Sequence, residues 1–417
     1  MSPIFPLEAF LRPLAENPWT YLVFGLIGFA FGYVLEISGF GNSKVLAAQF
    51  YFKNLTVLKV MFTAIVTAMV LIFLSSALGI LDFNLVYVPE THLWPGIVGG
   101  IIMGVGFIVG GFCPGTSLVS ASTLKIDGMI FVLGAVFGVW AFGETVQPYW
   151  EWWNTSGAYG RLTLMDVFHL PTGVVVLLVV FMALFMFWGG EKLEHIFGKK
   201  DLSREPKLRV AGAGLLIALA AAVLVIGQPT TADKWAGMAE EKTVSLEAGA
   251  VQIHPGELLA SLADQKLNVL MFDVRGESDY NLFHVRGAQR VTLEDIRELV
   301  PGLLGLTQNT PNTVIVLMSN DETAAAEAWK VLVAESVANV YILEGGVNNW
   351  ISVFGKGEVG IRPTPTPAAD DQLRYTFPAA LGDRYEAADP APHEWKIEYT
   401  PKIQLQRQRA PSGGGCG

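Results

Sequence analysis

A cysteine inside apolar, membrane-compatible sequence is the residue of this chain whose surroundings point most directly to chemistry. Cys113 lies in the run Gly-Gly-Phe-Cys-Pro-Gly-Thr-Ser (110–117), where Gly and Pro interrupt a hydrophobic segment and a new helical pattern begins. Backbone leaves the helical state at membrane depth only where it is buried in protein or lines a wet cavity. The interruption therefore predicts a pathway that carries a thiol. The plainer interpretation is a small buried hydrophobic residue beside a helix kink.

A second interruption resembles the first. The run Gly-Phe-Gly-Asn-Ser-Lys-Val-Leu (39–46) aligns with Gly-Phe-Cys-Pro-Gly-Thr-Ser-Leu (111–118). Such a pair is typical of re-entrant half-helices in a transporter built from repeats, whose N-termini favour an anion. Coincidence between two glycine-rich loops is the alternative. The predicted substrate path comprises Gly41, Asn42, Ser43, Gly111, Cys113, Pro114, Gly115, Thr116 and Ser117.

The elements that must position these residues are apolar helices. Hydrophobic residues make up 52% of the 417 positions, and the mean hydropathy is +0.42, which indicates a membrane protein with a soluble part. Six stretches of about 20 residues are long enough to cross a bilayer. They are 19–37, 57–80, 93–111, 128–146, 167–189 and 210–226. The net charge of −10 belongs mainly to the second half of the chain, and no basic stripe suggests nucleic-acid binding.

Lysines and arginines are unevenly distributed among the short connections. Lys44 and Lys53 follow the first span, Lys125 follows the third, and a basic cluster precedes the sixth, whereas the alternate connections carry a lone Arg161. Because cytoplasmic connections are enriched in Lys and Arg, both termini should face away from the cytoplasm. In a diderm bacterium this predicts a multi-pass inner-membrane protein with a periplasmic C-terminal domain. One span more or fewer would reverse the position of that domain.

On these motifs the first half of the chain resembles the YeeE/YedE sulfur-transport family. The resemblance covers about residues 20–190 and rests on the two interruptions and the glycine-rich helix at 128–143. It implies an inner-membrane carrier of thiosulfate or another sulfane-bearing anion, with cysteines that contact the passing sulfur. Cys113 matches the Cys-Pro-Gly cysteine of the family. The cysteine often found at the first interruption is Gly41 here, which leaves a single central thiol or a pore completed by a second copy.

The chemistry of such a thiol has two forms. A thiol can donate a weak hydrogen bond to a sulfane sulfur while backbone amides and the Thr116 or Ser117 hydroxyl hold the oxyanion end. A thiolate at a helix N-terminus has a lowered pKa and could instead attack. The sequence leaves passing contact and covalent transfer open. Glu36 and Glu144 lie near the path, and an interfacial carboxylate without a role is the favoured interpretation for each.

The second half of the chain predicts a soluble α/β domain. Apolar runs at 269–272, 314–317 and 340–343 alternate with helical patterns, which indicates a parallel sheet covered on both faces. This segment resembles a rhodanese domain. The resemblance rests on Asp273-Val274-Arg275, Tyr280, His284, Gly287-Ala288, the run Leu-Glu-Gly-Gly-Val (343–347) and Trp350.

Working rhodaneses carry a cysteine after the central strand, in a loop that binds a persulfide or thiosulfate. The corresponding position is Ser319 here. The degenerate loop comprises Ser319, Asn320, Asp321, Glu322 and Thr323. Without a thiol, and with two acidic residues in the loop, the domain is expected to be catalytically inactive and to serve in docking. Asp273, Arg275 and His284 are then expected to support the fold.

The predicted domain plan places the membrane domain at 1–227, a linker at 228–246, the rhodanese-like domain at 247–355 and an extended tail at 356–417. The tail ends in Gly-Gly-Gly-Cys-Gly, and Cys416 resembles the cysteine on the arm of the sulfur-carrier subunit of the periplasmic thiosulfate-oxidising Sox system. That resemblance implies a carrier of covalent sulfur intermediates. An inert or metal-prone tail is the alternative. As a flexible coil the tail would span on the order of 40–45 Å.

Taken together, the sequence predicts an inner-membrane transporter of thiosulfate or a related anion rather than an enzyme. No cofactor or metal is expected, because the six histidines are scattered, the two cysteines are far apart and no Walker-type loop occurs. The expected partners are the sulfur anion, the lipid bilayer, sulfurtransferase or sulfur-carrier proteins, and a second copy. The alternatives are a membrane-anchored sulfurtransferase that uses Cys416 and an accessory subunit of a membrane complex.

Overall fold

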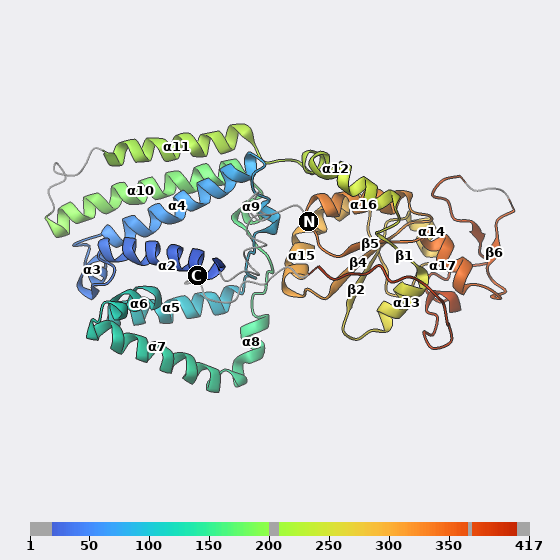
Figure 1. The fold of residues 1–417 in the computed structure, drawn as a ribbon, viewed down its shortest axis with the longest axis horizontal. Coiled ribbons are helices and arrows are strands. Elements are labelled where there is room, and N and C mark those ends of the chain that lie inside the picture. The colour runs from blue at the N-terminus through green and yellow to red at the C-terminus, as the bar shows by residue number, and fades with distance from the viewer. Residues whose placement is uncertain (1–18, 200–207, 366–368, 407–417) are drawn as a thin grey trace. The chain divides into compact units, whose positions relative to one another are not determined.

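The chain folds into two compact units. The computed structural model describes residues 19–199, 208–365 and 369–406 (Figure 1), and along the chain one unit ends at Gln228 and the next begins at Pro229. The helical unit contains residues 19–228, and the α/β unit contains residues 229–406. Each unit has the fold class that the sequence predicts, with apolar helices in the first and a parallel sheet in the second.

Long helices build the helical unit in the predicted order. They are α2 Trp19–Ile37, α4 Thr56–Ala77, α5 Leu93–Gly110, α7 Ile126–Thr145, α10 Thr172–Gly198 and α11 Leu208–Ile226. Short helices join them, namely α3 Ser43–Ala47, η1 Ala48–Tyr51, η2 Phe83–Leu85, α6 Pro114–Ser122, η3 Gln147–Tyr149, α8 Trp150–Thr155 and α9 Leu164–Phe168. The fifth long helix starts later than predicted because His169 adopts a left-handed conformation and Pro171 precedes α10, which separates α9 from it.

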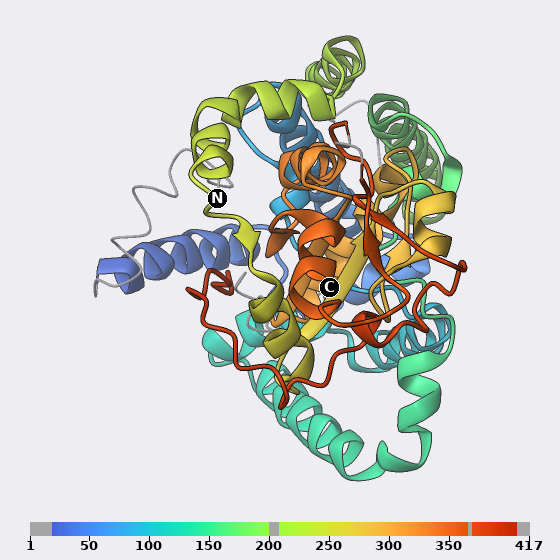
Figure 2. The ribbon, with the colours of Figure 1, turned by 90° about the vertical axis from the view of Figure 1, so that its right-hand side faces the viewer.

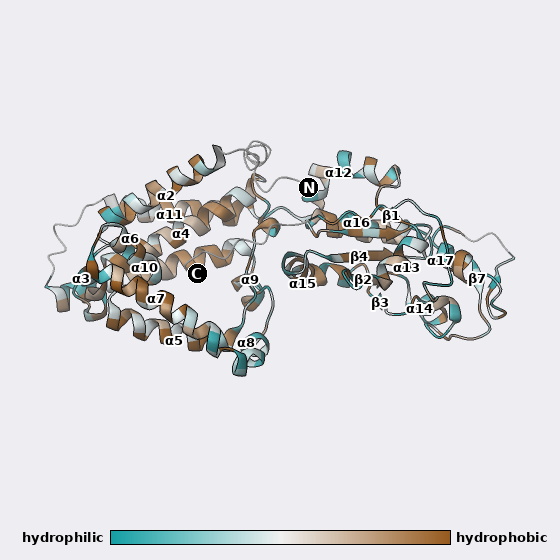
Figure 3. Cartoon of the chain, turned by 60° about the horizontal axis from the view of Figure 1, so that its bottom comes forward, coloured by the Kyte–Doolittle hydropathy of each residue, from teal (hydrophilic) through white to brown (hydrophobic). Residues whose placement is uncertain are grey.

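Among the residues that the structure describes, five helical segments are long and apolar enough to cross a membrane. They are α4, α5 continued through Ser122, α7, α10 and α11. Few of their residues are buried within the structure, and Figure 3 shows these helices coloured mostly brown, which marks hydrophobic residues. A soluble protein rarely exposes so large an apolar surface, whereas lipid accepts it. The first predicted span, α2, is described as a shorter apolar helix at Tyr21–Ile37, and its crossing stays a prediction.

The helices α4, α10 and α11 pack closely in the helical unit. Their shared core contains Val66, Val70, Val176, Val180, Ala183, Ala220 and Val223. A glycine permits the closest approach, because a Cβ atom on Gly173 would lie 2.5 Å from the Cα atom of Leu224. Small residues at such contacts are how helices pack tightly in lipid.

The α/β unit is built around a five-stranded parallel sheet in the order β1-β5-β4-β2-β3. Its strands are β1 Gln252–Ile253, β2 Asn268–Asp273, β3 Gln289–Arg290, β4 Thr313–Met318 and β5 Val340–Leu343. Its helices are α12 Thr231–Glu247, α13 Pro255–Ala263, α14 Glu277–Leu282, α15 Asp295–Asn309, α16 Thr323–Ala334 and α17 Gly346–Phe354. The central strand β4 is buried throughout, because a separate apolar core lies against each face of the sheet.

The segment interpreted as a linker forms most of α12. Thr230 and Asp233 cap its first turn reciprocally, Trp235 packs edge-on against Trp329 of α16, and Lys234 pairs with Glu335. The capping box and the tryptophan contact explain why this segment is a helix docked on the sheet domain rather than an extended connection.

The described tail also lies on the α/β unit instead of hanging from it. Figure 2 shows it in red, wrapped over this unit, with the short strands β6 Arg362–Pro363 and β7 Tyr375–Thr376 and the turn η5 Glu386–Ala388. The Trp350 indole donates to the Ala387 carbonyl at 2.7 Å, and the amides of Lys402 and Ile403 donate to buried Glu257 at 2.8 Å. The reach calculated for a free coil therefore does not apply to 369–406, which pack on this unit. Cys416 lies outside the described residues.

Candidate functional site

The two chain interruptions have matching local structure. Gly39 follows α2 with φ +80° and Gly111 follows α5 with φ +72°, a backbone region that disfavours side chains. Phe40 and Phe112 come next, and both are buried in one apolar cluster with Leu46 and Val57. The two breaks therefore pack together, and Figure 1 shows the helices that follow them, α3 and α6, at the same end of the helical unit. These matches support the predicted repeat.

Cys113 is the N-cap of α6. The Thr116 amide donates to Cys113 Sγ at 3.5 Å, and the Cys113 amide donates to Thr116 Oγ1 at 3.0 Å, which forms a reciprocal capping box. Sγ and Oγ1 are themselves 3.2 Å apart. At the first break Asn42 caps α3 by accepting from the Lys44 amide at 3.0 Å. Since Pro114 has no N–H group, the thiol stands at the positive end of a helix whose first donors belong to Gly115 and Thr116.

The hydroxyl groups beside the thiol are engaged within the helix. Ser117 Oγ donates to the Pro114 carbonyl at 2.7 Å, and Thr116 Oγ1 lies within hydrogen-bond distance of the Cys113 carbonyl at 3.2 Å. Both residues are buried, whereas Cys113 is partly exposed. The geometry therefore favours Thr116 as the residue that positions the sulfur, whereas the Ser117 hydroxyl is engaged with the helix backbone.

An ion pair lies at Gly41, the position aligned with Cys113. Lys125 Nζ lies 3.0 Å from Glu36 Oε1 and donates to the Gly41 carbonyl at 3.0 Å. A Cβ atom on Gly41 would lie 2.2 Å from Glu36 Oε2, so no thiol fits there unless the carboxylate moves. Glu36, which the sequence left without a role, thus helps Lys125 tie α7 to the first break. Lys125 was missed as a site residue, although it is the only lysine or arginine in the sequence between the third and fourth predicted spans. Glu144 is exposed near the end of α7.

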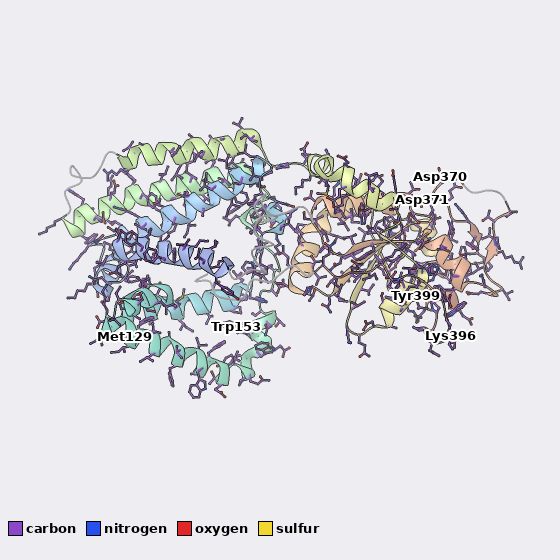
Figure 4. The ribbon with its side chains drawn as sticks, in the orientation of Figure 1. Met129, Trp153, Asp370, Asp371, Lys396 and Tyr399 are labelled. Atoms are coloured by element: carbon purple, nitrogen blue, oxygen red, sulfur yellow. The ribbon has the colours of Figure 1, made fainter. Side chains whose placement is uncertain are left out.

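The degenerate loop of the α/β unit follows β4. Ser319 is fully buried, and its hydroxyl has no hydrogen-bond partner in the part of the chain that the structure describes. The amides of Glu322 and Thr323 donate to Asp321 Oδ1. The amides of Asp321 and Ala324 donate to the two carboxylate oxygens of a tail residue, at 3.1 and 3.2 Å. That residue is Asp371, which Figure 4 labels.

These carboxylates fill a nest of backbone donors that would otherwise suit an anion. Asp371 in turn donates its own amide to Asp321 Oδ2 at 2.7 Å. Burial works to raise the pKa of Asp321, but hydrogen bonds from Thr323, Asp371 and Glu322 outweigh it and hold that pKa at about 2. The loop is therefore charged at neutral pH and occupied by the chain's own acceptors.

The predicted fold-supporting residues behave as such. Arg275 and Asp273 form a fully buried ion pair at 2.6 Å, and Arg275 also donates to the Phe283 carbonyl at 2.7 Å and to Asn320 Oδ1 at 3.3 Å. His284 stacks on Tyr280 with ring centres 3.8 Å apart. Because the Arg275 guanidinium is saturated by internal acceptors, it holds the loop and offers little to a substrate.

Comparison with known families gives two matches. A family model described as sulphur transport matches residues 37–263, which is more than half of the chain. A model described as a rhodanese-like domain matches residues 254–352. No curated protein matches the chain. The first match includes both interruptions, and the second includes the loop after β4.

Proposed function

The chain belongs to the sulphur transport family and carries a rhodanese-like domain, and on that premise we propose that it transports thiosulfate or another sulfane-bearing anion across a bacterial inner membrane. The family and the apolar helices establish a membrane protein for sulfur transport. The observation that carries the finer assignment is the position of Cys113. Its partly exposed sulfur caps α6 at a break packed against a second break.

The mechanism follows from the polarity of this site. The N-terminus of α6 carries a partial positive charge, which stabilises an anion that reaches it. The thiol is polarisable and donates only a weak hydrogen bond, so it suits a sulfane sulfur better than a water-like oxygen. Gly41 supplies no second thiol. We therefore assign Cys113 a single contact during passage, with Thr116 holding the sulfur in place.

We assign the rhodanese-like domain a docking role without sulfur transfer of its own. Ser319 stands where a working domain has its nucleophile, and a serine hydroxyl cannot form a persulfide. The carboxylates of Asp321 and Asp371 accept hydrogen bonds from the loop amides. They also place negative charge where an anionic substrate would bind. Sulfurtransferase or sulfur-carrier proteins are the partners that fit such a domain.

Uptake of labelled thiosulfate into proteoliposomes tests the proposal. Wild type should accumulate the label, and Cys113→Ala should not, at matched incorporation and thermal stability. Cys416→Ala is the matched control, because it removes the other cysteine of the chain and should leave uptake unchanged. Absence of uptake by wild type would reject the transporter assignment. Persulfide on Cys416 of the wild type, together with loss of uptake in Cys416→Ala, would instead favour a membrane-anchored sulfurtransferase. Stable copurification with other subunits, without flux, would favour an accessory subunit.

A further inference from the structure

Arg161 is a cation whose Nε and Nη2 have no hydrogen-bond acceptor within the described part of the chain. It is the only lysine or arginine between Lys125 and Lys192. Its Nε and Nη2 atoms are buried and have no hydrogen-bond partner among the residues that the structure describes. The guanidinium lies over the ring of Phe83, 5.6 Å from the ring centre. Burial lowers the pKa of Arg161, and Asp166 opposes that effect. A partly buried guanidinium with two buried, unused donors is unusual and points to a ligand.

The nearby carboxylate does not take up these donors. Asp166 Oδ2 accepts from the Thr163 amide at 2.8 Å and from the Thr163 hydroxyl at 2.7 Å, so it caps α9. Asp166 therefore balances the charge of Arg161 without satisfying its Nε and Nη2 hydrogens. Asp166 thus caps the helix and balances the charge, while the Nε and Nη2 donors of Arg161 stay unused within the described residues.

The backbone beside Arg161 is held in place. The Thr91 amide donates to the Gly160 carbonyl at 2.8 Å, and the Tyr159 amide donates to the Thr91 carbonyl at 3.0 Å. These bonds join the connection before α5 to the connection before α9. His92, on the first connection, also has a buried Nδ1 without a hydrogen-bond partner in the described chain. Arg161 thus lies beside two connections that are joined by backbone hydrogen bonds, here called the platform. The unpartnered Nδ1 atom of His92 lies on the same platform.

This platform is remote from Cys113. Figure 1 shows α8 and α9 at the end of the helical unit opposite α3 and α6. The helix α5 joins the two ends and, at 18 residues, is about 27 Å long. A solute that meets Arg161 must therefore travel a membrane thickness before it reaches the thiol.

We propose that Arg161 is an anion-capture site at the mouth of the transport path, where it binds the oxyanion end of the sulfur substrate. This inference rests on the proposed function. The Nε–Nη2 edge of a guanidinium presents two parallel donors that match two oxygens of a sulfonate-like group. Both donors are buried and the guanidinium lies over Phe83, so an anion reaches them only if the side chain moves. The unused donors make that exchange favourable, because the anion supplies the acceptors that the chain lacks.

Two measurements on the full-length protein test this site. Equilibrium binding of labelled thiosulfate, with sulfate as competitor, is compared with uptake into proteoliposomes. Arg161→Gln should weaken binding and raise KM by about tenfold or more, with Vmax little changed, because a truncated charge pair costs affinity. Arg161→Lys keeps the charge but loses the paired donors, and it should fall between Gln and wild type. Arg209→Gln removes a positive charge from α11 and is the matched control. Melting curves confirm that each variant is folded.

The outcomes separate this site from the proposed function. Thiosulfate binding that depends on Arg161, without uptake by wild type, would retain the capture site and reject the transporter assignment. Uptake by wild type with the same KM and binding in Arg161→Gln would reject the capture site and retain the transporter. Absence of any thiosulfate or sulfate binding by wild type would also reject the site. Equal loss in Arg161→Gln and Arg209→Gln would reduce the effect to net charge and overturn the assignment.

Discussion

At Cys113 the chain uses a thiol in a place where helices usually begin with Ser, Thr, Asp or Asn. The capping box with Thr116 fixes the position of Sγ, because the amide and the hydroxyl of one residue both lie against it. A sulfur atom is a poor acceptor, so the cap stabilises α6 less than an oxygen would. A cysteine in place of an oxygen-bearing cap residue is explained if its sulfur contacts the transported solute.

The residue pair Gly41 and Glu36 explains why the first break lacks a thiol. The Glu36 carboxylate fills the space that any side chain at position 41 would enter, and Lys125 holds that carboxylate there. A thiol at position 41 would therefore require the half-exposed Glu36 side chain to move away from it.

Replacing Thr116 with Val tests the positioning of the thiol. Thr116→Val removes the hydroxyl that lies 3.2 Å from Sγ and the acceptor of the Cys113 amide. We expect a loss of about 0.5–2 kcal/mol in stability from the broken cap, and a lower Vmax for thiosulfate uptake. Thermal unfolding and proteoliposome uptake measure the two effects.

Thr123→Val is the matched control for this prediction. Thr123 follows α6, and its hydroxyl donates to the Ser120 carbonyl at 2.9 Å, remote from the thiol in sequence. Equal uptake by Thr116→Val and wild type would show that the thiol needs no help from its neighbour. Equal loss in both variants would point to the stability of α6 rather than to the position of the sulfur.

At the scale of elements, the loop after β4 is distinguished by acceptors that replace a ligand. Asp321 accepts from the Thr323 amide at the start of α16. Asp371, which lies 50 residues after Asp321 in the sequence, accepts from the amides of Asp321 and Ala324. Oxygen atoms of these carboxylates occupy the donors that make a rhodanese loop an anion site. The domain keeps its sheet and its Asp273–Arg275 pair, and the proposed loss of sulfur-transfer chemistry is confined to this loop.

The depressed pKa of Asp321 predicts a pH-dependent stability. Its pKa of about 2 in the folded chain lies below the ordinary value of 3.8. The contribution of Asp321 is therefore fully present above pH 3.8 and disappears as the pH falls through about 2. Because the side chain is partly solvent-screened, we expect only about 1 kcal/mol. The unfolding free energy of wild type and Asp321→Asn, measured at pH 7 and at pH 2, should differ at pH 7 and converge at pH 2.

Asp295→Asn controls for the loss of a capping carboxylate elsewhere in the α/β unit. Asp295 accepts from the Thr292 hydroxyl at 2.7 Å at the start of α15, away from the loop. A difference between wild type and Asp321→Asn that persists unchanged at pH 2 would contradict the assigned pKa and the hydrogen bonds that cause it.

Helices and strands were predictable from sequence where local pattern determines them, and contacts between distant segments were not. The long apolar helices and the strand β4 stand out by hydropathy alone. The pairing of Glu36 with Lys125 spans 89 residues, and that of Asp321 with Asp371 spans 50, so neither leaves a local pattern. The helix α12 was missed although its Thr230–Asp233 capping box is visible in the sequence, because the adjacent polar composition suggested a linker.

For the whole molecule, the distribution of basic residues among the connections predicts the orientation of the helices in the membrane. Lys44, Lys53 and Lys125 lie in the connections at the α3 and α6 end of the helical unit. In the connections that contain η2, α8 and α9, Arg161 is the only lysine or arginine of the sequence. If Arg161 captures an anion from outside the cell, this end must face the periplasm. The positive-inside rule gives the same orientation from independent residues.

Labelling of single cysteines in intact cells tests this orientation. In a Cys113→Ala, Cys416→Ala background, Glu240→Cys places an exposed thiol on α12, and Lys199→Cys places one before α11. A maleimide that cannot cross the inner membrane should label position 240 and spare position 199. The reverse pattern would put the rhodanese-like domain in the cytoplasm and make Arg161 an exit site. Because α11 separates the two positions, labelling of both would show that α11 does not cross the membrane, whatever the orientation of the other helices.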